Sequence, residues 1–368
     1  MQYIIAVIFI ILGVFSKRSK VYTICFISFL CVLIGLNIHH LSNSNYYNMD
    51  FTNYYTLYLG NENGISGRDI EIGFQFIMVL CNKLGITFNM FRLLISIVGY
   101  VLIYDTIKKY TKYINYVFLL YFIFPFLNDA IQIRNFLSMS IIIYAFRYLI
   151  ENKKNNNIKY ILCIIIASSI HITSLFYLIF LLARVFRKRF ILGVSIYFSV
   201  ILVILSYTNL YPTLVSFIIK SNKVISYFDR RTTWGLIIVF GVLIMLVMSF
   251  YIMHKKCYLY YLNNITKNTS LKLRKEFLDI LWKCNILLII TAPLLVYDFN
   301  FIRLYRNILF LNYIVFVHAI LIAKKNKQEL MIYVGIALFV VGSLFIFFYG
   351  MNADTQIWPI LNDNMIFR

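Results

Sequence analysis

Long hydrophobic runs, separated by short polar segments, follow one another along nearly the whole chain. A helix that spans a membrane needs about 20 residues of this kind. By that measure the sequence contains about twelve hydrophobic segments, of which the first, third and fifth are short. The pattern predicts an all-α, polytopic integral membrane protein in which some helices are re-entrant or broken.

The composition agrees with a membrane protein. Hydrophobic residues make up 61% of the chain and charged residues 13%, whereas a soluble domain is about half apolar and a quarter charged. The formal net charge of +21 comes mostly from short Lys and Arg clusters between the hydrophobic runs. That distribution is typical of membrane topology signals, so we expect no nucleic-acid partner. Without a repeat or linker, residues 1–368 are predicted to form one multi-pass domain.

Basic clusters between membrane helices are expected on the cytoplasmic side. Six clusters qualify, namely Lys17–Lys20, Lys108–Lys112, Lys153–Lys159, Arg184–Arg189, Lys255–Lys275 and Lys324–Lys327. This places residues 39–70, the turn 128–134, residues 207–233, residues 297–306 and the tail 350–368 outside. The first run has its charges after it rather than before it, so we expect a retained helix with its N-terminus outside.

That placement requires two membrane-embedded hairpins. Residues 71–107 hold two runs but must cross once, and residues 158–183 form one run that must start and end inside. The second hairpin would turn at the polar break Ser168–Ser174. A rival topology crosses at every run, breaks the charge rule twice and moves Arg134 to the cytoplasmic side. We prefer the hairpins, which also imply a cavity, because irregular backbone at membrane depth is tolerated only inside protein or beside water.

Arg134 lies in a polar turn between two apolar runs, with Gln132 and Asn135 beside it. An Arg at the centre of a membrane helix costs about 2.5–3.5 kcal/mol. One reading is an interfacial Arg whose head reaches the lipid headgroups. The polar neighbours favour the other reading, a binding residue. His171 is a second ionisable group in a hydrophobic run, suited to carry a proton or to donate to a phosphate oxygen, although such a His can also be a packed core residue.

The first outside segment and the membrane entry after it contain Asp50, Asn53, Tyr54 and Glu71. A carboxylate there can act as general base or bind an acceptor hydroxyl. Glu71 opens an apolar helix, and its charge would also complement the helix N-terminus. Tyr and Asn suit carbohydrate, because aromatic faces stack on sugar rings and amides bind hydroxyls. They equally suit an interfacial aromatic belt or a solvated loop.

Arg303 and Arg306 are spaced by three with Asn300, which predicts one polar stripe on a helix at the outer side. The charge rule does not explain Arg at that side. Since guanidinium groups bind phosphate in a bidentate fashion, the two Arg and Arg134 could clamp a pyrophosphate. Contacts to lipid headgroups are the alternative.

Several kinds of site have no signal in the sequence. The six cysteines form no CxxC pair, which gives no disulfide framework and no zinc site. Neither a GxSxG, a Walker A, an HExxH nor a dinucleotide-binding glycine pattern occurs. We therefore expect no metal and no cofactor.

Five short motifs follow one another in a distinctive order. They are Asp50 with Asn53-Tyr54, Glu71-x-Gly73-Phe74, Ile133-Arg134, His171-x-Thr173-Ser174, and the pair Arg303 and Arg306. In this order they resemble the EpsG family of Wzy-like polysaccharide polymerases, which serve capsule, exopolysaccharide and O-antigen synthesis. The family often has Gln and a small residue where this chain has Asn135 and Ser138.

The resemblance implies a GT-C-like glycosyltransferase of the bacterial cytoplasmic membrane. Its donor and acceptor would be oligosaccharide repeat units on polyprenyl (undecaprenyl) pyrophosphate, joined at the outer face, with a chain-length regulator and a flippase as further partners. We assign Arg134, Arg303 and Arg306 to pyrophosphate, Asp50, Glu71 and His171 to catalysis, and Asn53, Tyr54, Gln132 and Asn135 to the glycan. The alternatives are a flippase or exporter of the lipid-linked unit, an acyltransferase that modifies the glycan, and a membrane scaffold. The absence of repeated halves disfavours a transporter.

Overall fold

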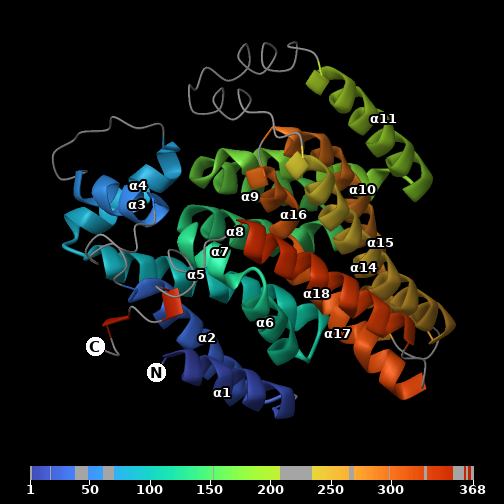
Figure 1. Cartoon of the computed structure of the whole chain (residues 1–368), viewed down its shortest axis with the longest axis horizontal. Helices are drawn as coiled ribbons and strands as arrows, with labels where there is room; N and C mark the ends of the chain where they lie inside the picture. Colours follow the sequence, from blue (N-terminus) through green and yellow to red (C-terminus); the bar gives the residue numbers. More distant parts are fainter. Residues whose placement is uncertain are drawn as a thin grey trace. The chain divides into compact units, whose positions relative to one another are not determined.

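The computed structural model describes residues 2–16, 18–37, 49–60, 70–151, 153–207, 234–264, 269–297, 299–326, 330–350, 360–361 and 364–365. Throughout these residues the chain is helical, apart from turns and one isolated bridge between Asn37 and Asn364 (Figure 1). The expected all-α polytopic membrane protein is confirmed. The contacts divide the chain into two compact units.

The first unit comprises residues 1–148, 158–177 and 351–368. Its elements are α1 (Gln2–Phe15), α2 (Lys20–Gly35), α3 (Met49–Gly60), α4 (Ile72–Lys83), α5 (Phe88–Tyr110), α6 (Ile114–Ile123), α7 (Phe126–Ile131), most of α8 (Ile133–Ile150) and α9 (Asn156–Ile170), and the start of the 3-10 helix η3 (Ile172–Phe180).

The second unit comprises residues 149–157 and 178–350. Its elements are α10 (Leu181–Val185), α11 (Lys188–Tyr207), α14 (Trp234–Asn264), α15 (Thr269–Leu287), η5 (Leu288–Val296), η6 (Phe299–Ile302), α16 (Arg303–Arg306), α17 (Leu309–Asn326) and α18 (Leu330–Gly350). The expectation of a single domain with the outside segments given above stays a prediction, and much of those segments lies outside the described residues.

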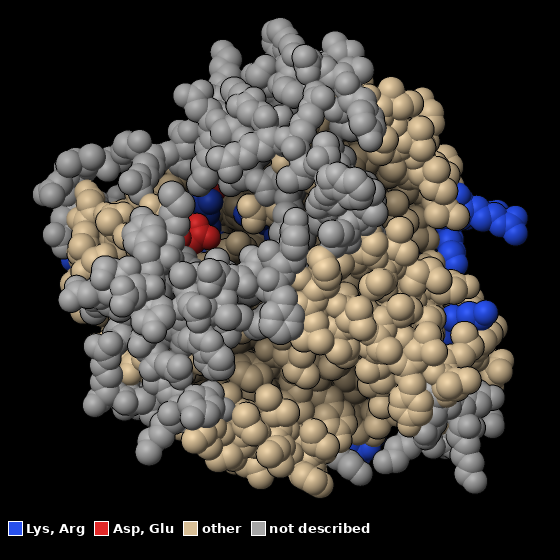
Figure 2. Space-filling view, viewed as in Figure 1, with Lys and Arg blue, Asp and Glu red and all other residues tan. Residues whose placement is uncertain are grey.

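Five helices in the described ranges are long and apolar enough to cross a membrane, or six if one bent pair forms a single span. They are Phe88–Tyr110, Ile133–Ile150, Lys188–Leu205, Gly241–Asn264 and Leu271–Leu295, and the bent pair is Asn300–Arg306 with Leu309–Ala323. The described surface seen in Figure 2 is almost entirely uncharged, with Lys and Arg mainly along one margin. Such a surface suits contact with hydrocarbon.

α5 and α8 pack side by side in the first unit and run in the same direction. Three contacts follow one another in the same order along both helices. Arg92 contacts Ala130, just before α8, and Gly99 packs on Ser140. Near the ends of the helices Thr106 contacts Arg147. A Cβ at Gly99 would lie 2.9 Å from the Ser140 hydroxyl oxygen, so the close approach requires glycine. Both helices therefore end on the same side, where the basic clusters after each of them also lie.

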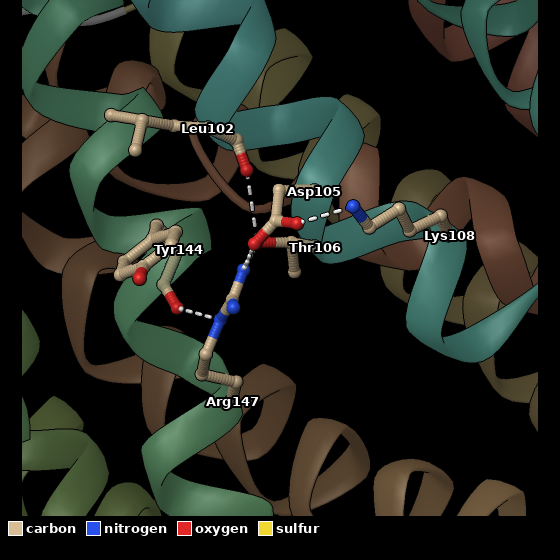
Figure 3. A network of polar contacts seen from close by, with 6 residues as sticks. All are labelled: Leu102, Asp105, Thr106, Lys108, Tyr144 and Arg147. Carbon is tan, nitrogen blue, oxygen red and sulfur yellow. Dashed lines mark hydrogen bonds and ion pairs between the residues drawn. The ribbon is translucent and has the colours of Figure 1, made fainter.

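A network of polar contacts joins the ends of these two helices (Figure 3). Arg147 Nη2 lies 2.6 Å from Asp105 Oδ2 and donates to the Thr106 hydroxyl, while Lys108 binds the other carboxylate oxygen at 2.6 Å. The Arg147 guanidinium also lies 3.8 Å from the ring centre of Tyr144. Charges this close to a membrane need such partners, and the network links the ends of α5 and α8.

Residues 156–185 form a hairpin, as the sequence predicted. α9 ends at Ile170, and η3 and α10 return antiparallel to it. The Tyr160 hydroxyl donates to the Tyr177 carbonyl at 2.7 Å, and nearer the open end Arg184 donates to Asn157 at 2.5 Å. The run thus starts and ends at the same end of the hairpin, as the preferred topology requires, and the polar break lies at the tip.

The other predicted hairpin is consistent with the lengths of α4 and α5. α4 has 12 residues, which is too short to cross, whereas α5 has 23.

Two other expectations are corrected. The fifth run is no single helix, because α6 ends at Ile123 and α7 starts after Pro125. The polar turn 128–134 is mostly helical, since only Gln132 separates α7 from α8.

The hairpin fixes a topology that labelling can check. With the native cysteines removed, Lys154→Cys and Arg187→Cys should both react with a membrane-impermeant maleimide only after the membrane is opened. The two positions flank the hairpin, are exposed, and lie in clusters of basic residues. Labelling of one position in intact cells and of the other only in opened cells would contradict the hairpin.

Candidate active site

The carboxylate of Glu71 is the centre of a polar cluster in the first unit. Glu71 directly precedes α4, yet its side chain makes no capping bond to that helix. Instead Arg134 Nη1 donates to Glu71 Oε2 at 2.5 Å, and the Ile172 N–H donates to Oε1 at 2.9 Å. His171 Nδ1 lies 3.3 Å from the same Oε1 atom. Three residues predicted separately for the site, Glu71, Arg134 and His171, therefore meet.

The hairpin tip explains why a carboxylate is held there. α9 ends where the His171 N–H bonds the Ala167 carbonyl, and the next residue opens η3. The first N–H groups of a helix have no partner within it, and an unpaired N–H at membrane depth is costly. The Ile172 N–H is the first of these groups in η3, and it donates to Glu71. The negative charge of Glu71 also complements the N-terminus of η3.

Arg134 is the second residue of α8, so its place depends on the break at Gln132. Its side chain is 12% exposed, against 17% for Glu71 and 7% for His171. Besides the bond from Nη1 to Glu71, the guanidinium has a buried Nε without a hydrogen-bond partner among the described residues. Arg134 therefore keeps donor capacity for a further anion.

The environment keeps Glu71 charged at neutral pH. Burial raises the pKa of this carboxyl, but the hydrogen bond with His171, the charge of Arg134 and the Ile172 N–H outweigh burial and lower the pKa to about 2. Glu71 in this arrangement is a bound anion and a weak base.

Two further contacts hold the hairpin tip on its neighbours. The hydroxyls of Ser138 and Ser174 are hydrogen-bonded to each other, which ties the first turns of α8 to the tip. On the other side, Gly73 of α4 packs against the Ser169 backbone. A Cβ at Gly73 would lie 2.7 Å from the Ser169 carbonyl oxygen, so only glycine allows this approach.

We expect Gly73→Ala to damage the cluster without touching a charged group. The methyl group would force α4 away from the hairpin tip and carry Glu71 with it. Overpacking of this kind costs about 1–3 kcal/mol. Activity should fall and the melting temperature of the purified protein should drop. Gly193→Ala is the control, since a Cβ there meets nothing within 4 Å.

The predicted glycan-binding residues, and Asp50, which was predicted for catalysis, lie in the first unit. Gln132 and the buried Asn135 flank Arg134. Asp50, Asn53 and Tyr54 lie on α3, where Asp50 is exposed in the first turn. The ring of Tyr54 lies 6.0 Å from that of Phe74 on α4, which brings α3 beside the helix that follows Glu71. No described group of three or more His, Cys, Asp or Glu side chains could hold a metal ion.

Arg303 and Arg306 lie in the second unit. Asn300 belongs to η6 and the two Arg residues form the ends of α16, which follows η6 without a break, so the expected polar stripe stays a prediction. Arg303 Nε donates to the Asn300 carbonyl at 2.8 Å, and Arg306 is buried. The hypothesis that both join Arg134 on one pyrophosphate stays a prediction.

The comparison with known proteins decides the family. The sequence model of the EpsG family matches residues 41–362, which is most of the chain. The chain belongs to the EpsG family. EpsG-like proteins are Wzy-like polysaccharide polymerases, so this EpsG member has a polymerase-like role in a membrane and is a glycosyltransferase-like enzyme in general terms. No curated protein and no solved structure matches the chain.

The EpsG match leaves open which residues act. Sequence reasoning also overlooked a buried cation of the first unit. Arg92 lies inside a hydrophobic run and is 1% exposed, which makes it the most enclosed Arg of the described residues. The rule that drew attention to Arg134, an ionisable group at membrane depth, would also have found Arg92.

Proposed function

We propose that the protein joins polyprenyl-pyrophosphate-linked oligosaccharide repeat units by glycosyl transfer, at the outer face of the bacterial cytoplasmic membrane. The observation that carries the proposal is the contact of Glu71, Arg134 and His171 at the tip of a membrane hairpin. An anion-binding guanidinium, a carboxylate and an imidazole are the groups such a transfer needs, and they meet in a member of a polysaccharide polymerase family.

In the proposed reaction, a hydroxyl oxygen of the acceptor unit attacks the anomeric carbon of the donor. A new glycosidic C–O bond forms, and the bond between the anomeric carbon and the pyrophosphate oxygen breaks. The electron pair leaves with polyprenyl pyrophosphate, and the hydroxyl proton passes to a base. Arg134 would stabilise the charge on the leaving pyrophosphate, because fixed donors in a poorly hydrated site act strongly on developing charge.

Glu71 is the proposed base. A pyrophosphate that binds Arg134 would compete with Glu71 for the guanidinium and place negative charge beside it, and both effects raise the proton affinity of the carboxylate. This weak base would thereby become a stronger one when the donor binds. His171, within 3.3 Å of Glu71, would orient the carboxylate or pass the proton on.

The test uses the purified full-length protein in nanodiscs with a lipid-linked repeat unit from the same biosynthetic locus. No nucleotide sugar and no ATP are added, and products are separated by glycan length. We expect a ladder of multiples of the unit and release of polyprenyl pyrophosphate. Unchanged substrate, together with movement of the unit between leaflets in liposomes, would instead identify a transporter and overturn the proposal.

A further inference from the structure

Arg92 connects the end of α7 with the segment that follows α2 in the first unit. Its Nη1 donates to the Asn37 carbonyl at 3.4 Å and its Nη2 to the Ala130 carbonyl at 3.3 Å. The guanidinium carbon lies 4.1 Å from the centre of the Phe51 ring. Among the described residues Arg92 has no ion pair with a carboxylate, so these carbonyls and the ring surround a buried cation.

The two carbonyls are suitable partners for a cation. Ala130 lies in the last turn of the six-residue α7, and Asn37 follows the end of α2. The last carbonyls of a helix lack partners within it and carry the negative end of its dipole. The guanidinium compensates the end of α7 at the Ala130 carbonyl, and the carbonyls of Ala130 and Asn37 compensate its own charge in return.

The end of α7 determines where Arg134 lies. Only Gln132 separates α7 from α8, and Arg134 is the second residue of α8. A shift of the Ala130 carbonyl therefore moves the start of α8 and the guanidinium that binds Glu71. We propose that Arg92 is a positioning residue that sets the placement of Arg134 through the end of α7. This inference rests on the proposed function only where it concerns catalysis.

The other partner of Arg92 is itself held from several directions. The Asn37 carbonyl also accepts from Asn89 Nδ2 at 3.4 Å, and Asn37 pairs with Asn364 in the isolated bridge. The Met365 N–H donates to the Leu36 carbonyl at 2.9 Å. Arg92 thus links the end of α7 to a segment, Leu36 and Asn37, that other contacts already hold in place. A positioning contact requires such a fixed partner.

Arg147 provides a matched control. It is also a buried Arg, but it joins the ends of α5 and α8 (Figure 3), whereas Arg92 lies near the start of α5 and binds the end of α7. Arg92→Met and Arg147→Met each remove a guanidinium while they keep an unbranched side chain of similar length. If Arg92 only stabilised the packing of the first unit, as Arg147 does, both variants would lose activity in proportion to their loss of thermal stability.

The first readout is turnover with the lipid-linked unit. Arg92→Met is expected to lower kcat about 10- to 100-fold, because small misplacements of a catalytic group have effects of that size, whereas Arg147→Met should stay near wild type. In an Arg134→Lys background, Arg92→Met should cost much less, since residues that act through one another are not additive. Equal losses in both backgrounds would overturn the proposal.

The second readout needs no polymerase activity. Because the Ser138 and Ser174 hydroxyls are in contact, Ser138→Cys with Ser174→Cys, in a background without native cysteines, should form a disulfide under mild oxidation. We expect Arg92→Met to slow this cross-link and Arg147→Met to leave it unchanged. Unchanged cross-linking in Arg92→Met would refute the positioning role. If cross-linking of the double-cysteine protein depends on Arg92 as expected, but the native sequence makes no ladder, the proposed function alone would be refuted.

Discussion

Arg134→Ala is expected to abolish polymer formation while the protein remains in the membrane at wild-type amount. The side chain supplies the charge proposed to stabilise the leaving pyrophosphate, and loss of one such donor costs about 10²–10³ in rate. Arg134→Lys keeps the charge but loses the planar fork, so it should retain partial activity. Glycan length on gels and the rate of the nanodisc reaction measure both.

A structural explanation of that loss can be tested separately. Arg134→Ala also leaves Glu71 without its ion-pair partner, so the melting temperature of the variant must be compared with that of Arg134→Lys. Arg303→Ala examines whether the Arg pair of the second unit contributes as well. Long chains made by Arg134→Ala at the wild-type rate would exclude Arg134 from the reaction.

Glu71→Gln is expected to have an effect of similar size, about 10²–10⁴-fold on kcat, the range found for general bases. The amide oxygen can still accept from the Ile172 N–H, so the hairpin tip keeps its hydrogen bond. What is lost is the charge and the ability to take a proton. Donor binding should therefore survive better than turnover.

Asp50→Asn is the matched control, because Asp50 was the other carboxylate predicted as a base. It is exposed in the first turn of α3. If Asp50 takes the proton, Asp50→Asn should be the slower variant and Glu71→Gln should lose mainly stability. Comparison of kcat with the melting temperature for the two variants distinguishes these outcomes.

Most of the architecture could be predicted from hydropathy and charge. The basic clusters on both sides of residues 158–183, with the polar break at Ser168–Ser174, were enough to predict a hairpin. Helix ends were harder to predict. Pro125 restricts the residue before it and separates α6 from α7, yet the hydrophobic run continues across it without a change in composition.

The members of the cluster could be predicted, but their contacts could not. Glu71, Arg134 and His171 stood out because ionisable groups at membrane entries and in apolar runs are expensive. That Glu71 would bind a guanidinium 63 residues away, rather than cap its own helix, depends on tertiary packing. The ion pair also depends on the close approach of Gly73 to the hairpin tip. In the sequence this approach is marked only by one glycine in an apolar helix.

The bond from Asn364 to the Val32 carbonyl joins residues 332 positions apart. A ribosome releases the chain in order, so α2 enters the membrane long before Asn364 and Met365 exist. The first unit, which contains Glu71, Arg134 and His171, therefore receives its final contacts only after all the helices of the second unit have been made. During synthesis the described helices that precede Asn364 would all have been made while the contacts of Asn364 and Met365 beside Asn37, the partner of Arg92, were still missing, which delays completion of the site.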